Sequence, residues 1–298
     1  MTDQKMKTAK KCYLCSSIKF KSRTGIVRDN PKIKIIECCD CNLVFLDSHD
    51  HIRPRFYEDS GMHGLFKISM NSWLSSSRND DIRRVNMLKP LLINKMVLDF
   101  GCGAGGFLGE AKKLATEVVG VEIETRVRKY WKGKLDIRSS LNSTKPLSKD
   151  IITAFHVIEH LKDPRSILKI LAQKLAKDGR LIIEVPNSDD ALLALFQSRP
   201  FQEFTYWSQH LYLFNNFTLK RLAEQAGLNV LSIQHIQRYP LSNHLYWLRH
   251  GKPGGHQKWA FLNSQNLHEA YSSALAKIGK TDTIVAYLEK GSSENESK

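Results

Sequence analysis

The 298-residue sequence lacks any apolar run close to the roughly 20 residues that a membrane-spanning helix needs. Its apolar runs are short, such as Met96 to Leu98, Leu181 to Ile183 and Ala191 to Phe196. The lysine-rich start is not followed by an apolar region, which argues against a secretory signal. We therefore expect a cytoplasmic protein without a membrane span.

Acidic residues are scarce, because 30 Asp and Glu face 45 Lys and Arg and leave a formal net charge of +15. This excess favours an anionic partner such as a phosphate group, a nucleic acid or an anionic membrane surface, although a need for solubility explains it as well. The apolar share of 42% and the charged share of 25% are ordinary for a globular protein. No internal repeat is evident, and the length allows one large domain and a small one.

Cysteine is infrequent, yet four of the six cysteines form two pairs, Cys12-x2-Cys15 and Cys38-x2-Cys41, separated by 22 residues. Each pair can turn two thiolates toward one ion, and two such pairs complete a closed tetrahedral zinc site. The spacing predicts a structural zinc ribbon. Disulfides or a redox Cys-x-x-Cys remain the alternative, which a reducing cytoplasm disfavours.

A glycine-rich turn follows the apolar stretch Met96 to Phe100, and a helical pattern begins at Phe107. Glycines at Gly101, Gly103 and Gly105 let the backbone turn sharply and approach a ligand. A strand, such a turn and a helix form the first unit of a nucleotide-binding sheet. The dinucleotide fingerprint is absent, because the third glycine comes only two residues after the second.

The next predicted strand, Glu117 to Val121, leads to Glu122, which lies 21 positions after Gly101. An acidic residue at about this distance is expected to bind ribose hydroxyls. The spacing therefore favours a ligand that contains a nucleoside.

The run His-Val-Ile-Glu-His-Leu-Lys-Asp-Pro begins at His156, directly after a predicted strand from Asp150 to Phe155. His156, Glu159 and His160 also spell an inverted zinc-protease signature, but that signature needs both histidines on one helix. A strand feeds this run, so we disfavour the protease. A purely structural role for Glu159 and His160 remains open.

The glycine turn, the Val-Gly-Val-Glu strand and the His-Val-Ile-Glu-His-Leu run together resemble class I S-adenosylmethionine-dependent methyltransferases, over roughly Asp81 to Glu289. The resemblance implies an α/β fold with a doubly wound, Rossmann-like, seven-stranded sheet. It implies S-adenosylmethionine as cofactor. The implied cofactor contacts are Asp99, Gly101, Cys102, Gly103, Gly105, Glu122, Ile123, Phe155 and His156. Arg138 and two serines stand where the family often has an acid that meets adenine, so the adenine contacts stay unassigned.

Four parts of the chain are predicted from these patterns. They are a zinc-ribbon segment at 1–52, a linker or lid at 53–80, a methyltransferase domain at 81–290 and a disordered tail at 291–298. The domain carries insertions at 188–214 and 239–282. The first, rich in aromatics, suggests a substrate lid. The second is dense in aromatic and basic residues, which fits an anionic substrate or a dimer contact.

The N-terminal ribbon resembles a segment found on some sugar-modifying methyltransferases. We therefore expect a small anionic acceptor, most simply a nucleotide-linked sugar or a surface-polysaccharide precursor. An RNA methyltransferase that uses the ribbon as a nucleic-acid clamp is the alternative, and a scaffold that keeps the fold without catalysis is a third hypothesis.

Two histidines are candidates for the general base, His160 first and His210 second. Each lies in a stretch expected at the carboxyl edge of the sheet. A largely neutral imidazole can accept a proton from an acceptor hydroxyl.

Overall fold

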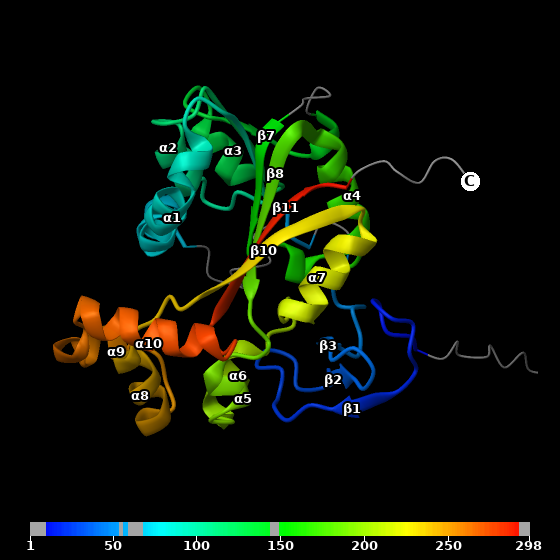
Figure 1. Cartoon of the computed structure of the whole chain (residues 1–298), viewed down its shortest axis with the longest axis vertical. Helices are drawn as coiled ribbons and strands as arrows, with labels where there is room; N and C mark the ends of the chain where they lie inside the picture. The colour runs from blue at the N-terminus through cyan, green and yellow to red at the C-terminus, as the bar shows by residue number, and fades with distance from the viewer. Residues whose placement is uncertain (1–9, 54–55, 59–67, 144–148, 292–298) are drawn as a thin grey trace, which may run out of the picture. The chain divides into compact units, whose positions relative to one another are not determined.

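The computed structural model describes residues 10–53, 56–58, 68–143 and 149–291 (Figure 1). By packing, the chain divides into two compact units, each described here by itself. The cysteine unit comprises the residues up to His49 together with Asn187–Leu222 and Ile236–Asp282. The sheet unit comprises Asp50–Pro186, Ala223–His235 and the residues from Thr283 onward. None of the helices in the described ranges combines the length and the apolar character that a bilayer crossing requires.

The sheet unit is built on a seven-stranded sheet with the order β10-β11-β8-β7-β4-β5-β6. Its strands are β4 (Met96–Phe100), β5 (Glu117–Val121), β6 (Asp136–Arg138), β7 (Lys149–Phe155), β8 (Leu175–Pro186), β10 (Leu228–Ile236) and β11 (Thr283–Lys290). The pairs from β8 through β6 are parallel, and β11 runs antiparallel to β8. The predicted α/β, doubly wound, seven-stranded architecture is thus confirmed. Its strand order reverses between β4 and β7, where such sheets bind ligands at their carboxyl ends.

Helices cover both faces of this sheet, with α1 (Met70–Leu92), α2 (Gly106–Ala111) and α3 (Thr125–Trp131) on one side and α4 (Pro164–Lys174) on the other (Figure 1). The first helix, α1, begins inside the segment predicted as a linker or lid at 53–80. It begins at Met70, where the Ser69 hydroxyl accepts the Ser72 amide at 3.1 Å and caps the helix. Its first turns are rich in serine and carry no apolar stripe that the sequence could reveal.

Most residues of β4 and β7 are buried on both faces of the sheet, which is typical of central parallel strands. Val97, Leu98, Ile152 and Ala154 are almost completely buried. This core fixes the ends of the two strands, from which the glycine turn and the His156 run depart.

The cysteine unit contains a smaller antiparallel sheet, ordered β1-β2-β3-β9. Its strands are β1 (Phe20–Ser22), β2 (Ile35–Cys38), β3 (Val44–Leu46) and β9 (Tyr212–Leu213). The last strand comes from the segment predicted as a lid, and Phe45 lies opposite Tyr212 in the register. The N-terminal segment therefore completes its sheet with residues far along the chain.

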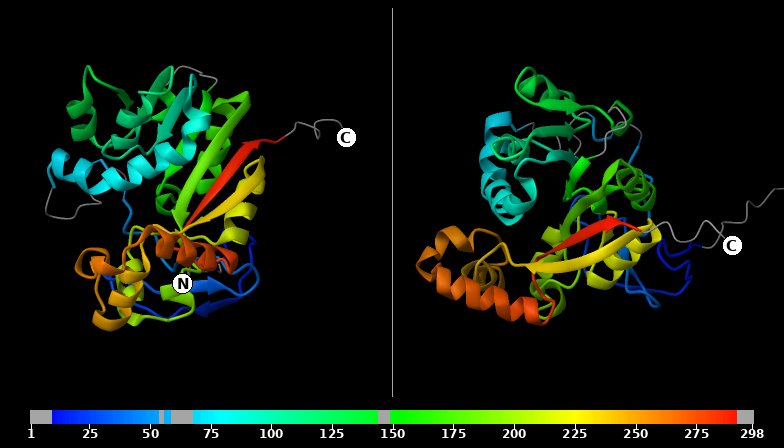
Figure 2. Two further views of the ribbon diagram at one scale, coloured as in Figure 1. Left: turned by 60° about the vertical axis from the view of Figure 1, so that its left-hand side comes forward. Right: turned by 45° about the horizontal axis from the view of Figure 1, so that its top comes forward.

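The predicted lid at 188–214 holds two short helices besides β9, namely α5 (Ala191–Ala194) and α6 (Arg199–Thr205). Arg23 ties it to the N-terminal segment, since its guanidinium donates to the Tyr206 hydroxyl at 2.9 Å and to the Ser188 carbonyl at 2.6 Å. The second insertion is helical, with α8 (Leu241–His250), α9 (Gly255–Lys258), the 3-10 turn η4 (Ala260–Leu262) and α10 (Gln265–Lys277). Figure 2 shows these orange helices side by side. The predicted tail from 292 onward, and most of the linker between 54 and 67, lie outside the described residues.

The second insertion is closed at its base by Asp282. Its carboxylate accepts hydrogen bonds from the Gln237 amide group at 3.0 Å, the Arg238 backbone N–H at 2.9 Å and the Tyr239 backbone N–H at 3.2 Å. The Arg238 side chain donates to the other oxygen at 3.1 Å. One buried carboxylate thus joins the segment that enters the insertion to the residue where it ends.

We predict that Asp282→Asn lowers the free energy of unfolding by about 3 kcal/mol, because an amide cannot accept from all of these donors and leaves Arg238 uncompensated. Urea denaturation measures the loss. Glu203→Gln is the control, since its pair with Arg199 is exposed and should matter by less than about 0.5 kcal/mol. Equal stability of the two variants would contradict the assigned role of Asp282.

Candidate functional site

The glycine turn after β4 has the backbone geometry that its sequence predicts. Gly101, Gly103 and Gly105 have φ angles of 70°, 51° and 80°, in the left-handed region that favours glycine. The turn is also crowded, because a Cβ added at Gly101 would lie 2.4 Å from a Val157 methyl carbon. Conformation and close packing against the turn after β7 therefore both require glycine at Gly101.

Two carboxylates border this turn. The Glu122 carboxylate accepts the Gly103 amide at 3.0 Å and the Glu124 amide at 2.9 Å, so the acid after β5 meets the turn after β4. Burial raises the pKa of Glu122, although these amides oppose the shift. Asp99 accepts the Thr153 hydroxyl at 2.7 Å, and burial raises the pKa of Asp99 to about 7. The spacing of Gly101 and Glu122 in the sequence thus corresponds to a real juxtaposition.

The other predicted cofactor residues lie around the same strand ends. Cys102 is buried, and burial raises the pKa of its thiol well above the usual range, which removes it as a nucleophile. Phe155 packs edge-on against Phe107 with centroids 5.0 Å apart, while Ile123 is partly exposed. The polar backbone of the glycine turn therefore lies next to the apolar rings of Phe107 and Phe155.

Two tryptophans that the sequence analysis did not single out hold the glycine turn. The Trp131 indole N–H donates to the Ala104 carbonyl at 2.8 Å, and its ring covers Gly105. Trp73 of α1 lies 3.4 Å from where a Cβ of Gly103 would stand, and the Arg126 guanidinium lies 5.1 Å from its ring centroid. Both residues lie on helices outside the motif, so the local pattern carried no signal for them.

His156 lies where β7 ends, with a φ of 54° that is rare outside glycine. Its Nδ1 is 3.2 Å from a Glu159 oxygen, and its Nε2 is 3.1 Å from a Glu184 oxygen. A carboxylate oxygen accepts, so the contact with the ionised Glu184 needs a proton on Nε2 of His156, while Nδ1 faces Glu159. With both nitrogens facing acids, His156 is poorly placed to take a proton from an acceptor.

The fully buried Glu184 of β8 is also bound by two arginines of α1. Arg83 and Arg84 donate to its carboxylate at 2.9 and 2.7 Å. Burial alone would raise the pKa of Glu184, but the His156 hydrogen bond and the charges of Arg84, His156 and Arg83 hold it well below its usual range. Glu184 was not predicted as a site residue. The acid sits inside an apolar strand pattern, and its two arginine partners lie about a hundred positions earlier in the chain.

The two predicted base candidates lie in different units. His160 is buried in the 3-10 turn η3 (Ile158–His160), its Nε2 is 4.0 Å from a Glu159 oxygen, and its carbonyl accepts the Tyr57 hydroxyl at 3.3 Å. His210 lies in the cysteine unit, where its Nδ1 is 3.1 Å from the Thr205 carbonyl. That contact places the proton on Nδ1 of His210.

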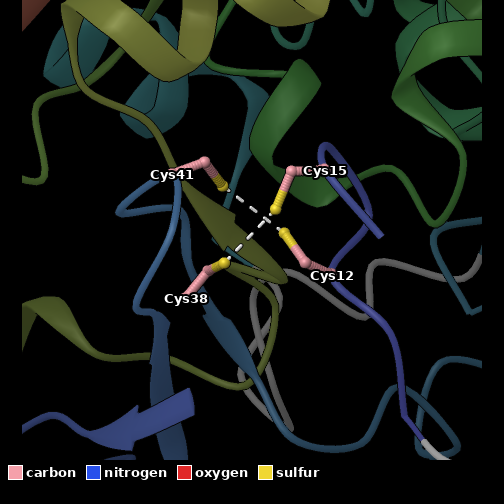
Figure 3. Close-up of side chains that lie close together, drawn as sticks. All are labelled: Cys12, Cys15, Cys38 and Cys41. Atoms are coloured by element: carbon pink, nitrogen blue, oxygen red, sulfur yellow. Dashed lines mark hydrogen bonds between the residues drawn. The ribbon is translucent and has the colours of Figure 1, made fainter. Parts of the chain in front are cut away.

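The four predicted zinc ligands come together in the cysteine unit, with their sulfur atoms facing a common point (Figure 3). Their sulfurs all lie within 4.8 Å of one another, with Cys12 and Cys41 at 3.5 Å and Cys15 and Cys38 at 3.4 Å. A tetrahedral zinc with Zn–S bonds of about 2.3 Å would space its sulfurs by about 3.8 Å. The donor set and its spacing fit that ion, whereas a disulfide needs about 2.05 Å.

The two cysteine pairs have matching backbones. Ser16 after the first pair and Asn42 after the second have φ angles of 59° and 61°. Burial raises the pKa of Cys12 to about 11, opposed by the amides of Cys15 and Leu14. Burial also acts to raise the pKa of Cys38, but the Cys41 and Asp40 amides outweigh it and lower that pKa to about 7. Amides aimed at sulfur in both pairs stabilise thiolates, the form that binds metal.

Comparison with known proteins bears on the sheet unit above all. The family model described as "Methyltransferase domain" matches residues 77–233. The ubiquinone biosynthesis O-methyltransferase of Cupriavidus pinatubonensis is 24% identical over 194 residues, which cover 55% of this chain and 76% of that protein. The enzyme of the same name from Coxiella burnetii is 29% identical over 178 residues, covering 51% of this chain and 71% of that protein.

Among solved structures, a chain of the complex between the Haloferax volcanii Trm112 methyltransferase activator and a methyltransferase aligns with a TM-score of 0.51. It is 13% identical and covers 76% of this chain and 98% of that chain. At this identity the likeness shows the fold alone.

We predict that Gly101→Ala disrupts the turn, because the new methyl group meets Val157 and the left-handed φ adds strain. Calorimetric titration with S-adenosylmethionine should show an affinity at least about tenfold weaker. Gly133→Ala is a matched control, since Gly133 has a φ of 79° but no described atom within 4 Å of an added Cβ. The double variant Gly101→Ala with Val157→Ala should regain part of the affinity, and failure to do so would exclude the clash as the cause.

We also predict that Glu184→Gln lowers the free energy of unfolding by about 3 kcal/mol at neutral pH, because Arg83, Arg84 and His156 lose their counter-charge. The folded pKa of Glu184 is depressed, so its contribution is complete above the unfolded value and disappears as the pH falls through the folded one. The difference between the two proteins should therefore shrink below about pH 4. Glu289→Gln, which removes a half-exposed partner of Arg180, is the control. A difference that persists unchanged in acid would refute the charge argument.

Proposed function

Because this chain belongs to the methyltransferase domain family and is an S-adenosylmethionine-dependent methyltransferase, we propose that it methylates a hydroxyl of a small anionic metabolite. A nucleotide-linked sugar or a surface-polysaccharide precursor is the proposed acceptor class. The relatives named O-methyltransferases support the proposal that the methylated atom is an oxygen. The net charge of +15 supports an anionic acceptor.

S-adenosylmethionine supplies a methyl group that its sulfonium already activates. The chain must therefore mainly bind, align and exclude water. We propose that the glycine turn and Asp99 bind the methionine part and that Glu122 binds the ribose hydroxyls. Glu122 suits this role because two backbone amides already hold its carboxylate in place.

His160 is our first candidate for the general base that takes the proton of the acceptor hydroxyl. His156 is a weaker choice, since both of its ring nitrogens already face carboxyl oxygens. His160 is buried with its Nε2 4.0 Å from a Glu159 oxygen, and a negative charge at that distance favours the imidazolium that forms when the base takes a proton. His210 is the second candidate.

The acceptor can be identified directly from a mixture of cell metabolites. The protein is incubated with extract and S-adenosylmethionine carrying a ¹³C methyl group, and the labelled product is analysed by mass spectrometry and NMR. We expect a methyl ether on an anionic sugar derivative. Label in an RNA fraction would overturn the proposal in favour of the nucleic-acid alternative, and an N-methyl or C-methyl product would overturn the oxygen assignment.

With the acceptor in hand, we predict that His160→Ala lowers kcat by about 10²- to 10⁴-fold, the range of a general base, and leaves cofactor affinity almost unchanged. His210→Ala is assayed in parallel. Retention of near-wild-type turnover in both variants would show that positioning alone carries the reaction.

We propose that Cys12, Cys15, Cys38 and Cys41 bind one structural zinc ion. Cys38→Ser should lower the zinc content of the purified protein from one equivalent to well below it and destabilise the cysteine unit, with cofactor affinity nearly intact. Cys39→Ser is a close control, because Cys39 is exposed and its sulfur lies outside the cluster. Stoichiometric zinc in the Cys38 variant would contradict the assignment.

A further inference from the structure

The second insertion lies in a long stretch without acidic residues. No Asp or Glu occurs between Glu224 and Glu269, whereas Arg238, Arg249, Lys252 and Lys258 do. This stretch thus carries four cations and no acid, and its residues 241–262 form helices of the second insertion.

The tip of this insertion, residues 241–262, consists of α8, α9 and the 3-10 turn η4. The Tyr246, His250 and Trp259 rings pack against one another with centroid distances of 4.5, 5.2 and 5.6 Å. The Trp247 ring packs on Phe201 and Phe204 of α6 at 5.1 and 5.2 Å. Its large aromatic residues therefore serve largely to hold the tip together.

What the tip presents to solvent is different. Phe261 is 81% exposed, Leu248 is 44% exposed and Leu245 is 37% exposed. Arg249, Lys252 and Lys258 are exposed as well. Leu245 and Leu248 lie three residues apart on α8 and so share one face of that helix. The exposed side chains are aliphatic or phenyl groups interspersed with cations.

We propose that this tip docks the protein on an anionic lipid surface. Apolar side chains can enter the boundary between headgroups and acyl chains while lysines and arginines remain at the level of the phosphates. Residues 225–268 themselves contribute no carboxylate that an anionic surface would repel. Docking of this kind is peripheral and requires no spanning helix.

Two other partners fit the tip less well. An RNA partner would stack successive bases on several exposed aromatic rings, but Phe261 is the one exposed phenylalanine, tyrosine or tryptophan ring of the described tip, Tyr246 and Trp247 are buried, and the leucines offer no stacking surface. A second copy of the chain would bring like charges together in a symmetric contact. The proposal goes beyond methyl transfer and holds whatever the acceptor is.

Cosedimentation of the full-length protein with vesicles tests the proposal. The vesicles contain phosphatidylcholine alone or an equal mixture with phosphatidylglycerol. We expect binding to the anionic vesicles that weakens as salt rises, and little binding to the neutral ones. Wild-type protein that ignores both kinds of vesicle, or binds both equally, would overturn the proposal.

Variants separate the two parts of the surface. Phe261→Ala should weaken binding to anionic vesicles about tenfold through the loss of an inserted ring. The double variant Lys252→Gln with Lys258→Gln should weaken it about 25-fold, since each cation near the surface contributes roughly fivefold. The controls are Phe217→Ala, which removes a phenyl group that is 76% exposed on α7 (Asn216–Gln225), and Lys132→Gln with Lys169→Gln, which removes exposed lysines of the sheet unit.

Control variants that lose as much binding as the tip variants would refute the assigned surface. So would tip variants that lose retention of total RNA on filters while vesicle binding stays intact, an outcome that would assign the tip to nucleic acid. Circular dichroism and urea denaturation verify that each variant is folded. No step of this test measures methyl transfer, so its failure is independent of the proposed acceptor.

Discussion

The sheet unit depends on one fully buried carboxylate, that of Glu184. Its oxygens join α1, the end of β7 and β8 through Arg83, Arg84 and His156. A charge of this kind is stable inside a protein only when its partners are in place. The glycine turn relies on the same region, because Gly101 packs against Val157, the residue after His156. The position of the turn and the balance of buried charge are therefore set together.

This arrangement suits a reaction that depends mainly on how the reactants are positioned. Glu122 and the glycine turn are held by backbone hydrogen bonds, and Trp131 and Trp73 close over the turn from two helices. A rigid setting of this kind suits a transfer whose donor is already activated and needs mainly alignment. The cysteine unit is organised differently. Its N-terminal segment is too short for a large core, and four cysteine sulfurs meet where a metal ion could hold that segment together.

Much of this could be predicted from local sequence. The turn at Gly101, the acid at Glu122 and the cysteine pairs are read from residue types at fixed spacing, and the strands from apolar runs. The start of α1 could not be read that way, because its first turns are polar and only the cap at Ser69 marks it. Nor could the partners of Glu184 be predicted, since a contact between residues a hundred positions apart leaves no periodic trace in one sequence. Trp131 was missed because it lies on α3, 27 positions after its partner Ala104 and outside the glycine motif.

The pairing of β3 with β9 has a consequence for the order of folding. The N-terminal segment cannot complete its sheet until Tyr212 and Leu213 have been synthesised, long after β3 itself. At usual rates of translation this delay is on the order of ten seconds. During that time the edge of β3 that later pairs with β9 remains unpaired, and the four thiols are already synthesised. A metal ion captured early would hold the cysteines together and protect that open edge from pairing with another nascent chain.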